Sequence, residues 1–318
     1  MYLMNTFKVM TSSLDIAPWV ADDLPPQTGR TVIVTGANSG IGLETTRAFA
    51  AAGAHVVMAV RNVTRARRTT ADLPGSLELR RLDLADLASV REFAASVDGP
   101  VDVLINNAGV ANVPLGRTAD GFETHFGTNH LGHFALTNLL LPQITDRVVT
   151  IASNAHKNAV LDLADPNWKR RSYRSSAAYG QSKLANLLFT LELQRRLTEA
   201  GSSVRALAAH PGAAMTGLNR HLGPVMKVVA ATVGRLISQS ERHGAQPILF
   251  AATRDLPGAS YAGPDGRGGQ RGRPTLVPRS ARAQDPALAA GLWEVSERLT
   301  DTAFPPGRPH RLSGTAVD

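Results

Sequence analysis

A glycine-rich turn between a strand and a helix constrains this sequence more than any other feature. The run Thr31-Val-Ile-Val-Thr35 is rich in β-branched residues, which predicts a short buried strand. It leads directly into Gly36-Ala-Asn-Ser-Gly-Ile-Gly42, and the Ala-rich segment from Ile41 to Ala52 has a helical pattern. Glycines permit a tight turn and a close approach of the backbone to phosphate. The free N–H groups and positive dipole end of the helix would bind a pyrophosphate, so the turn predicts a dinucleotide site.

The spacing of the glycines narrows the kind of dinucleotide-binding turn that the sequence predicts. It is G-x-x-x-G-x-G, which differs from the G-x-G-x-x-G of the general dinucleotide fingerprint. A glycine-rich loop alone is also compatible with an ordinary strand–helix turn, but the strand before it and the helix after it favour the dinucleotide site. The candidate cofactor-binding residues of the turn are Gly36, Asn38, Ser39, Gly40, Ile41 and Gly42.

The second strand bears on which dinucleotide is bound. NAD-binding proteins usually place an acidic residue about 20 residues after the glycines, on the ribose 2′-hydroxyl. No acidic residue occupies positions 58–62 after the run His55-Val-Val-Met-Ala-Val60, and Arg61 stands there, followed by Asn62. A guanidinium can pair with a 2′-phosphate. We therefore expect NADP(H) rather than NAD(H), although Arg65, Arg67 and Arg68 also fit a solvated basic helix.

Apolar runs alternate with helical stretches along the chain. The runs cover residues 31–35, 56–60, 77–82, 101–106, 148–152 and 204–208. This alternation predicts an α/β protein, a single-domain Rossmann fold with a doubly wound parallel sheet and helices on both faces. With 318 residues and no internal repeat, the chain divides into an N-terminal extension (1–28), one Rossmann-type domain (29–262) and a C-terminal part (263–318). Within the last part, we expect loop over 264–285, an amphipathic helix over 286–300 and a flexible tail.

A tyrosine and a lysine stand four residues apart in Ala178-Tyr-Gly-Gln-Ser-Lys183. Positions i and i+4 share one face of a helix, so Tyr179 and Lys183 would point into one site. A nearby cation favours the phenolate and lowers the tyrosine pKa, which suits a general acid/base. Ser153 follows the apolar run that ends at Ala152 and is a third candidate. The Y-x-x-x-K pair alone also occurs on solvated helix faces, so its weight depends on the dinucleotide motif upstream.

Taken in order, these motifs resemble the short-chain dehydrogenase/reductase family over residues 29–261. The matching pieces are Thr35-Gly-Ala-Asn-Ser-Gly-Ile-Gly42, Asp83-Leu84, Asn106-Asn-Ala-Gly109, Asn129, Ser153, Tyr179 with Lys183, and His210-Pro-Gly212. Three further stretches, Ala59-Val-Arg-Asn62, Thr128-Asn-His-Leu-Gly-His-Phe134 and Gln181-Ser-Lys-Leu-Ala-Asn186, resemble its retinol-dehydrogenase-like branch. That branch includes many bacterial members and is similar to protochlorophyllide reductases. A long gap between Ser153 and Tyr179, which holds Asp162 to Lys169, is similar to an insertion in the same branch.

The resemblance implies a role for each matching position. Tyr179 would exchange a proton with the substrate oxygen, Ser153 would position that oxygen, and Lys183 would lower the tyrosine pKa and bind the nicotinamide ribose. Asn129 would hold a water that links Lys183 to solvent. The other implied cofactor contacts are Asp83 and Leu84 near adenine, Asn107, Ala108 and Gly109 along the adenosine ribose, and Pro211, Gly212 and Thr216 beside the nicotinamide.

Composition excludes several other classes of site. The chain has no cysteine, which rules out disulfides and thiolate catalysis, and no metal-ligand spacing stands out, so we expect no metal. The missing cysteine also argues against a light-driven protochlorophyllide reductase. The net charge of +8 raises the question of nucleic acid, but the basic residues are spread along the chain. We read the charge as attracting an anionic cofactor and expect no nucleic-acid partner.

Two regions bear on substrate and setting. Residues 217–240 contain the apolar run Val225 to Ile237, which in the family forms a flap and would suit a lipophilic aldehyde, ketone, retinoid or steroid; a core helix, an oligomer contact and membrane docking are the alternatives. Residues 1–10 are too short and mixed for a transmembrane segment or signal peptide, so we expect a cytoplasmic protein, with Met1 and Met10 both candidate starts. By analogy alone, helices around 121–144 and 179–200 are candidates for a homodimer contact.

Two classes of function follow from these observations. The first is an NADP(H)-dependent oxidoreductase that interconverts a carbonyl and an alcohol, with reduction the expected direction because cells keep NADPH largely reduced. The second is a catalytically weak dinucleotide-binding regulatory or scaffold protein of the same fold. Such proteins often lose the serine, tyrosine or lysine, whereas Asn129, Ser153, Tyr179 and Lys183 are all present, which favours the enzyme. An epimerase or dehydratase would use G-x-x-G-x-x-G spacing, which the turn does not match.

Overall fold

The computed structural model describes residues 24–213 and 240–305, and its centre is one eight-stranded sheet. The strand order is β3-β2-β1-β4-β5-β6-β7-β8, and all neighbouring pairs are parallel except β7 with β8. The order reverses between β1 and β4, as in a doubly wound fold. The strands are β1 (Thr31–Thr35), β2 (His55–Val60), β3 (Ser76–Arg81), β4 (Val101–Asn106), β5 (Ile144–Ile151), β6 (Arg205–Ala209), β7 (Tyr261–Pro264) and β8 (Pro274–Leu276).

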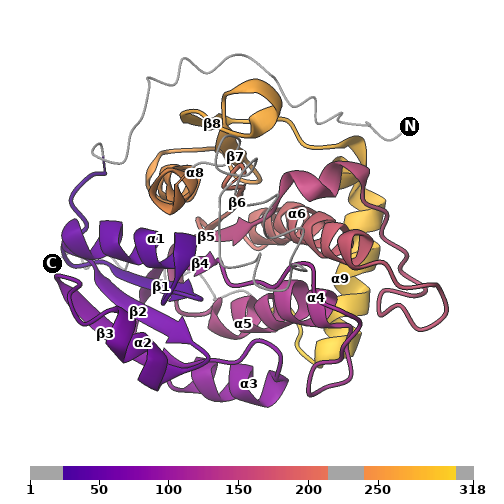
Figure 1. Ribbon diagram of the computed structural model, residues 1–318, viewed down its shortest axis with the longest axis horizontal. Coiled ribbons are helices and arrows are strands. Elements are labelled where there is room, and N and C mark those ends of the chain that lie inside the picture. Colours follow the sequence, from indigo (N-terminus) through magenta and orange to yellow (C-terminus); the bar gives the residue numbers. More distant parts are fainter. Residues whose placement is uncertain (1–23, 214–239, 306–318) are drawn as a thin grey trace, which may run out of the picture.

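Helices cover both faces of this sheet (Figure 1). The described helices are α1 (Gly40–Ala51), α2 (Val63–Thr69), α3 (Leu87–Ala95), α4 (Thr124–Phe126), α5 (Gly132–Leu140), α6 (Ser175–Glu199), α8 (Glu241–Thr253) and α9 (Pro286–Thr300). A π-helical turn, η2 (Gly127–Leu131), joins α4 to α5, and the shorter turns are η3 (Asn154–Asn158), η5 (Arg267–Gly269) and η6 (Ala281–Gln284). The predicted single-domain Rossmann fold is confirmed.

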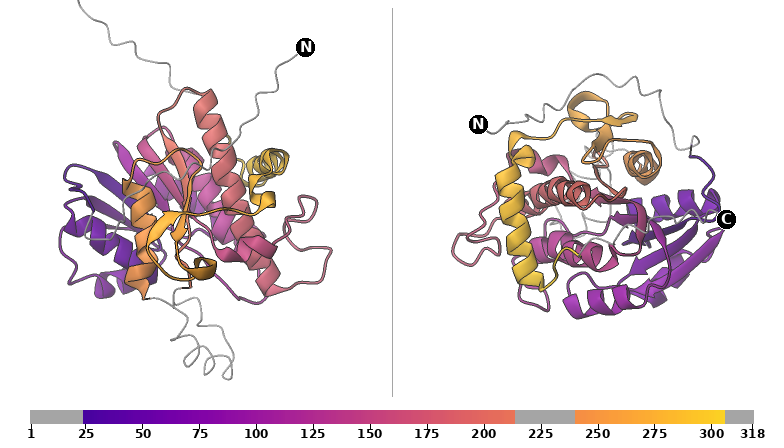
Figure 2. Two further views of the ribbon diagram at one scale, coloured as in Figure 1. Left: turned by 90° about the horizontal axis from the view of Figure 1, so that it is seen from above. Right: turned by 180° about the vertical axis from the view of Figure 1, so that it is seen from behind.

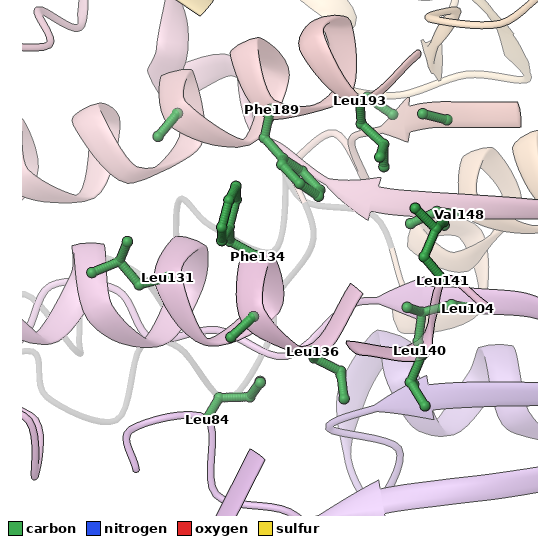
Figure 3. Packing of buried hydrophobic residues seen from close by; sticks show 14 of the residues in the cluster. Leu84, Leu104, Leu131, Phe134, Leu136, Leu140, Leu141, Val148, Phe189 and Leu193 are labelled. Carbon is green, nitrogen blue, oxygen red and sulfur yellow. The ribbon is translucent and has the colours of Figure 1, made fainter. Parts of the chain in front are cut away.

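Alternation along the strands builds one core on each face. On β1, Ile33 packs in the cluster that includes residues of α3, α5, α6 and α9, while Val32 and Val34 pack in the cluster that includes residues of α1 and α8. Successive side chains of a strand point to opposite faces, so a strand covered on both sides is apolar throughout. Figure 3 shows the first cluster, where Phe134 of α5 and Phe189 of α6 meet between the two helices.

The C-terminal helix closes one side of the molecule. The helix predicted over 286–300 is α9, and it lies against α6 (Figure 2). Its Trp293 stacks on Phe189, with ring centroids 5.7 Å apart, and meets Phe134 edge-on at 4.8 Å. The parts of α5 and α6 that carry these two phenylalanines are therefore covered within one chain, although both helices fall in the ranges expected for a homodimer contact.

One expectation about the chain's C-terminal part was wrong. The stretch 264–285, predicted to be loop, contains β8 and the short turns η5 and η6. β8 is a three-residue edge strand that pairs antiparallel with β7 and begins with Pro274. Proline is tolerated at the edge of a sheet because it lacks only a hydrogen that faces away from the ladder. So short a strand in a Gly- and Pro-rich stretch leaves almost no periodic signal.

Candidate active site

Five parallel strands deliver the predicted residues to one edge of the sheet. Gly36 follows β1, Arg61 follows β2, Asn107 follows β4, Ser153 comes two residues after β5, and Pro211 comes two residues after β6. The carboxyl ends of parallel strands meet at the same edge, and ligands of open α/β sheets bind there. The fold therefore gathers motifs that are up to about 175 residues apart in the sequence.

The glycine-rich turn has the geometry that a phosphate site needs. Gly36 and Gly40 have φ values of 67° and 57°, in the left-handed region that favours glycine. A Cβ atom added at Gly42 would lie 2.4 Å from the carbonyl oxygen of Gly36, so no larger residue fits there. Ser39, the N-cap of α1, makes no side-chain capping bond, and the first turn of α1 holds no acidic residue. The carboxylate of Glu241 on α8 lies next to this helix end, because a Cβ atom added at Gly40 would lie 3.4 Å from its Oε1 atom. A helix N-terminus favours an anion, so the turn is the candidate site for a dinucleotide pyrophosphate.

A threonine and an asparagine fasten this turn to the neighbouring strand. The hydroxyl of Thr35 accepts hydrogen bonds from the backbone N–H groups of Asn107 and Ala108, both at 2.9 Å. The side-chain amide of Asn107 donates to the carbonyl oxygen of Thr35 at 2.8 Å. Asn107 and Ala108 were predicted as cofactor contacts, and the structure also gives them this bracing role. This bracing role of Thr35 is not among the sequence predictions, and its place directly before the first glycine is the signal that could have indicated it.

The residues expected near the adenosine lie beside the ends of β2 and β3. Arg61 is exposed, and within residues 24–213 and 240–305 its guanidinium makes no hydrogen bond or ion pair. Asn62 caps α2, since its side-chain oxygen accepts from the backbone N–H of Arg65 at 2.8 Å. Asp83 is partly exposed and accepts from the N–H of Ala85, whereas Leu84 is buried. The Arg61 guanidinium is therefore exposed at the carboxyl end of β2.

Three candidate catalytic side chains lie together above β5. The hydroxyl of Tyr179 is hydrogen-bonded to Ser153. One turn further along α6, the ammonium of Lys183 donates to the carbonyl oxygen of Ile151 at 3.0 Å and lies 5.8 Å from the centroid of the Tyr179 ring. Lys183 is 4 % exposed. The i, i+4 spacing thus presents phenol and ammonium on one face of α6, as the sequence predicted.

Asn129, the fourth candidate catalytic residue, sits in the π-helical turn η2 and is fully buried. Its side-chain amide donates to the hydroxyl of Ser182 and to the carbonyl oxygen of Val110, each at 2.9 Å. Its side-chain oxygen accepts from the N–H of Val110 at 2.8 Å. A Cβ atom added at Gly109 would lie 3.0 Å from this oxygen and 3.6 Å from the ammonium of Lys183, so Gly109 adjoins both. π-helical turns frequently mark functional positions in helices.

A buried histidine connects Asn129 to the turn that follows β1. The Nδ1 atom of His133 donates to the carbonyl oxygen of Asn129 at 3.0 Å, and its Nε2 atom lies 2.9 Å from the hydroxyl of Thr35. Burial lowers the pKa of His133 to about 4, so the ring is neutral at physiological pH and Nε2 accepts from Thr35. A single imidazole therefore joins the dinucleotide side of the site to the candidate catalytic side.

The pKa values of Tyr179 and Lys183 differ from the expectation in one respect. Burial raises the pKa of Tyr179, and the hydrogen bond from Ser153 acts in the opposite direction. The expected lowering by Lys183 does not govern the phenol, because desolvation is the larger effect at this position. Burial also lowers the pKa of Lys183 itself from 10.5 to about 8. The lysine is thus the group of this pair that titrates nearest to neutral pH.

The residues predicted beside the nicotinamide are described in part. Gly212 has a φ of 67°, and its N–H donates to Nδ1 of His210 at 3.3 Å. Pro211 lies between them, two residues after the end of β6. Thr216 and the apolar segment 217–239 lie outside the described residues. Within the described part of the chain, no helix is long and apolar enough to cross a membrane, and no group of three or more His, Asp or Glu side chains could hold a metal ion.

Comparison with known proteins agrees with this architecture. A family model described as short chain dehydrogenase matches residues 30–226. Retinol dehydrogenase 13 from Homo sapiens is 40% identical over 301 residues, which cover 89% of this chain and 88% of that protein. Polyprenol dehydrogenase from Mus musculus is 40% identical over 297 residues, 87% of this chain and 85% of that protein.

A solved structure of an uncharacterized protein from Mycobacterium Paratuberculosis is 52% identical, with a TM-score of 0.80, over 91% of this chain and 99% of that chain. The family match covers more than half of the sequence, and the similarity to retinol dehydrogenase 13 extends over most of both proteins. The chain therefore belongs to the short-chain dehydrogenase family and has relatives among the retinol dehydrogenases.

Proposed function

We propose that this protein is an NADP(H)-dependent oxidoreductase that interconverts a carbonyl and an alcohol on a lipophilic substrate, with Tyr179 as the general acid/base. One observation carries the proposal. The Tyr179 hydroxyl is hydrogen-bonded to Ser153, with the buried Lys183 one helical turn away, at the same sheet edge as the glycine-rich turn. The hydroxyl and ammonium provide proton transfer and charge stabilisation next to a dinucleotide-binding turn.

The mechanism follows from what these side chains can do. Ser153 donates to the carbonyl oxygen and holds it beside Tyr179. The dinucleotide, when bound at the turn, supplies the hydride. As negative charge develops on the oxygen, Tyr179 transfers its hydroxyl proton to it, and the resulting phenolate is stabilised by the Lys183 ammonium. Asn129 braces α6 through Ser182, which keeps Tyr179 and Lys183 in place. In the alcohol-to-carbonyl direction each proton step runs in reverse.

The cofactor preference rests on Arg61. Its exposed guanidinium, at the carboxyl end of β2, makes no ion pair among the described residues, and no acidic side chain replaces it at positions 58–62. A 2′-phosphate would form charge-assisted hydrogen bonds with it, whereas a ribose hydroxyl would gain much less. NADP(H) is therefore the proposed cofactor, with NAD(H) bound more weakly.

The proposed substrate class rests on the relatives and on the apolar segment near position 230. Retinol and polyprenol, the molecules that appear in the names of the two relatives above, are long apolar alcohols. The run Val225 to Ile237, with two charged residues among thirteen, would suit contact with such a molecule. A cytoplasmic enzyme that reduces lipophilic aldehydes or ketones is the proposal that joins these observations.

A panel of carbonyl compounds separates this proposal from a dinucleotide-binding protein without turnover. Purified protein is incubated with NADPH and retinaldehyde, decanal or acetophenone, and both NADPH consumption and alcohol formation are measured. We expect stoichiometric formation of alcohol from at least one apolar compound. Tight NADPH binding by calorimetry, with no alcohol from any of the three, would favour the binding protein.

The rate of reduction is expected to fall as the pH rises through about 8. Burial lowers the pKa of Lys183 to about 8, so the ammonium that stabilises the phenolate is lost above that pH, while the raised pKa of Tyr179 keeps its hydroxyl protonated. The pH profile of kcat/KM reports such groups in the free enzyme. An alkaline limb near the ordinary lysine value of 10.5, or none at all, would contradict this assignment.

Unfolding does not explain such a loss. The pKa of Lys183 in the folded protein lies below its ordinary value. Between these two pH values the unfolded chain therefore binds more protons than the folded one. The contribution of Lys183 to the free energy of unfolding thus rises with pH. A melting temperature measured at each pH separates the two effects. From this group alone we expect no decrease in stability above pH 8.

A further inference from the structure

The long segment between Ser153 and Tyr179 folds onto the two helices that carry the candidate catalytic residues. The side-chain oxygen of Asn167 accepts from the backbone N–H of Glu123, at the start of α4, at 2.9 Å. The amide of Gln181 on α6 donates to the carbonyl oxygen of Pro166 at 2.8 Å. Residues 162–174 thus bridge α4 and α6 rather than forming a free loop.

A tryptophan anchors the end of this segment. Trp168 is 6 % exposed and has a φ of 53°, a left-handed conformation that is rare for a bulky residue. The guanidinium carbon of Arg171 lies 3.8 Å from its ring centroid, and Tyr173 meets it edge-on at 5.6 Å. These contacts fix the position of Tyr173, which stands two residues before α6 begins.

Tyr173 joins two fully buried polar side chains. Its hydroxyl lies 3.1 Å from Oε1 of Glu123, 3.1 Å from Nδ1 of His125 and 3.2 Å from the carbonyl oxygen of Val113. Glu123 and His125 are both 0 % exposed, and Nδ1 of His125 lies 2.8 Å from Oε1 of Glu123. We call Glu123, His125 and Tyr173 the Glu123 cluster. It links the docked segment, the loop after β4 and the start of α4.

The carboxylate of Glu123 sets the orientation of the His125 ring. Burial acts to raise the pKa of Glu123, but hydrogen bonds from the His125 side chain and from the backbone N–H groups of His125 and Phe126 outweigh it, so the pKa lies below its ordinary value. The ionised carboxylate therefore accepts from Nδ1 of His125. Nε2 of His125 has no hydrogen-bond partner among the described residues. Among the hydrogen bonds of the described residues, those at Nδ1 therefore set the orientation of the His125 ring.

The oriented ring contacts the candidate catalytic tyrosine. The ring centroids of His125 and Tyr179 are 6.1 Å apart with an interplanar angle of 63°, an edge-on arrangement. The hydroxyl of Tyr179 is held by Ser153, and the Lys183 ammonium lies 5.8 Å from its ring centroid. His125 thus supplies a third constraint, on the ring itself.

We propose that His125 and Tyr173 are positioning residues for Tyr179, and that the segment 162–174 acts on the reaction through them. This rests on the proposed function, in which Tyr179 is the general acid/base. Glu123 fixes His125, Tyr173 ties the docked segment to this pair, and the imidazole ring keeps the phenol aligned with the substrate oxygen. Small misplacements of a catalytic group, about 1 Å, can cost as much as 10²-fold in rate.

The His125→Asn variant separates the ring contact from the hydrogen bond. The asparagine amide can still donate to Glu123, but no ring remains beside Tyr179. We expect kcat for the best carbonyl compound to fall by about tenfold, the KM for NADPH to stay unchanged, and the deuterium isotope effect with deuterated NADPH to rise. The matched control is His55→Asn, because His55 pairs with Ser76 and Glu78 on the exposed edge of β2 and β3. A folded His125→Asn enzyme with the kcat of the wild type would overturn the proposal.

A second measurement requires no substrate. The chain has four tyrosines, so NMR of protein labelled at the phenol carbon of tyrosine gives few signals, and Tyr179→Phe assigns the one from Tyr179. Tyr173→Phe leaves His125 in place. We expect it to shift the Tyr179 signal through the Glu123 cluster, and an unshifted signal would refute the coupling. If Tyr179→Phe retained full turnover, the proposed function would fail, while the NMR result would still report on the cluster.

Discussion

Replacement of Tyr179 by phenylalanine is expected to lower carbonyl reduction by about 10²–10⁴-fold, the usual contribution of a positioned general acid. The variant keeps the ring that meets His125 and loses the hydroxyl that bonds Ser153. NADPH binding should persist, because the glycine-rich turn and Arg61 are untouched. Steady-state rates with the most active carbonyl compound, together with calorimetric titration of NADPH, measure the two effects separately.

Tyr261→Phe is the matched control for this experiment. The Tyr261 hydroxyl is buried and has no hydrogen-bond partner among the described residues, so its loss removes no bond there. We expect its rate to stay close to that of the wild type. Equal rates for Tyr179→Phe and Tyr261→Phe would remove Tyr179 from the chemistry.

Replacement of Arg61 by aspartate is expected to reverse the preference between the two dinucleotides. Hydrogen bonds to a charged partner contribute about 1.5–3 kcal/mol, and each 1.4 kcal/mol is tenfold in affinity. The dissociation constant for NADPH should therefore rise by about 10- to 100-fold, while an aspartate at the end of β2 can accept from the ribose hydroxyls of NADH. Titration of both dinucleotides against wild type and variant gives the ratio directly.

Arg47→Asp controls for the change in net charge. Arg47 is half exposed on α1 and pairs with Glu44 rather than with any residue of the candidate site. It alters the overall field by the same amount and should leave the NADPH to NADH ratio unchanged. If the two variants lowered NADPH affinity equally, long-range attraction rather than a 2′-phosphate contact would explain the preference.

Local sequence signals predicted the elements whose residues repeat a simple pattern. The strand 31–35 and the helix 286–300 have the predicted bounds, and the run 101–106 became β4. β-branched runs and an apolar helical stripe are read directly from period and composition. The strand β5 is longer than expected and begins at Ile144. Its first residues include the polar Thr145 and Asp146, so they do not belong to the apolar run from which the strand was predicted.

The candidate site was predictable where a motif is contiguous and not where it depends on tertiary contacts. The spacing of Tyr179 and Lys183 places them on one helix face, and the glycines of the turn form a motif that is recognisable in the sequence. The Glu123 cluster could not be foreseen, because Tyr173 reaches Glu123 from 50 residues away. Asn62 was expected at the cofactor. In the structure it caps α2, a role that could not be predicted without knowing where that helix begins.

The raised pKa of Tyr179 also depends on tertiary structure and could not be predicted from the sequence. A nearby lysine predicts a lowered value, but the extent of burial decides the sign, and burial is a property of the packed structure. The side chain that contacts the Tyr179 ring, His125, comes from 54 residues earlier in the sequence. Sequence spacing identifies which groups meet, and tertiary packing sets their protonation.

Transfer of deuteride from labelled NADPH tests the central claim most directly. Protein, NADPH deuterated at the nicotinamide C4 position and retinaldehyde, decanal or acetophenone are combined, and the alcohols are analysed by mass spectrometry. We predict that an alcohol from at least one carbonyl gains a single deuterium at its carbinol carbon, and that Tyr179→Phe suppresses it. Saturating NADPH binding without deuterium in any of the alcohols would contradict the account.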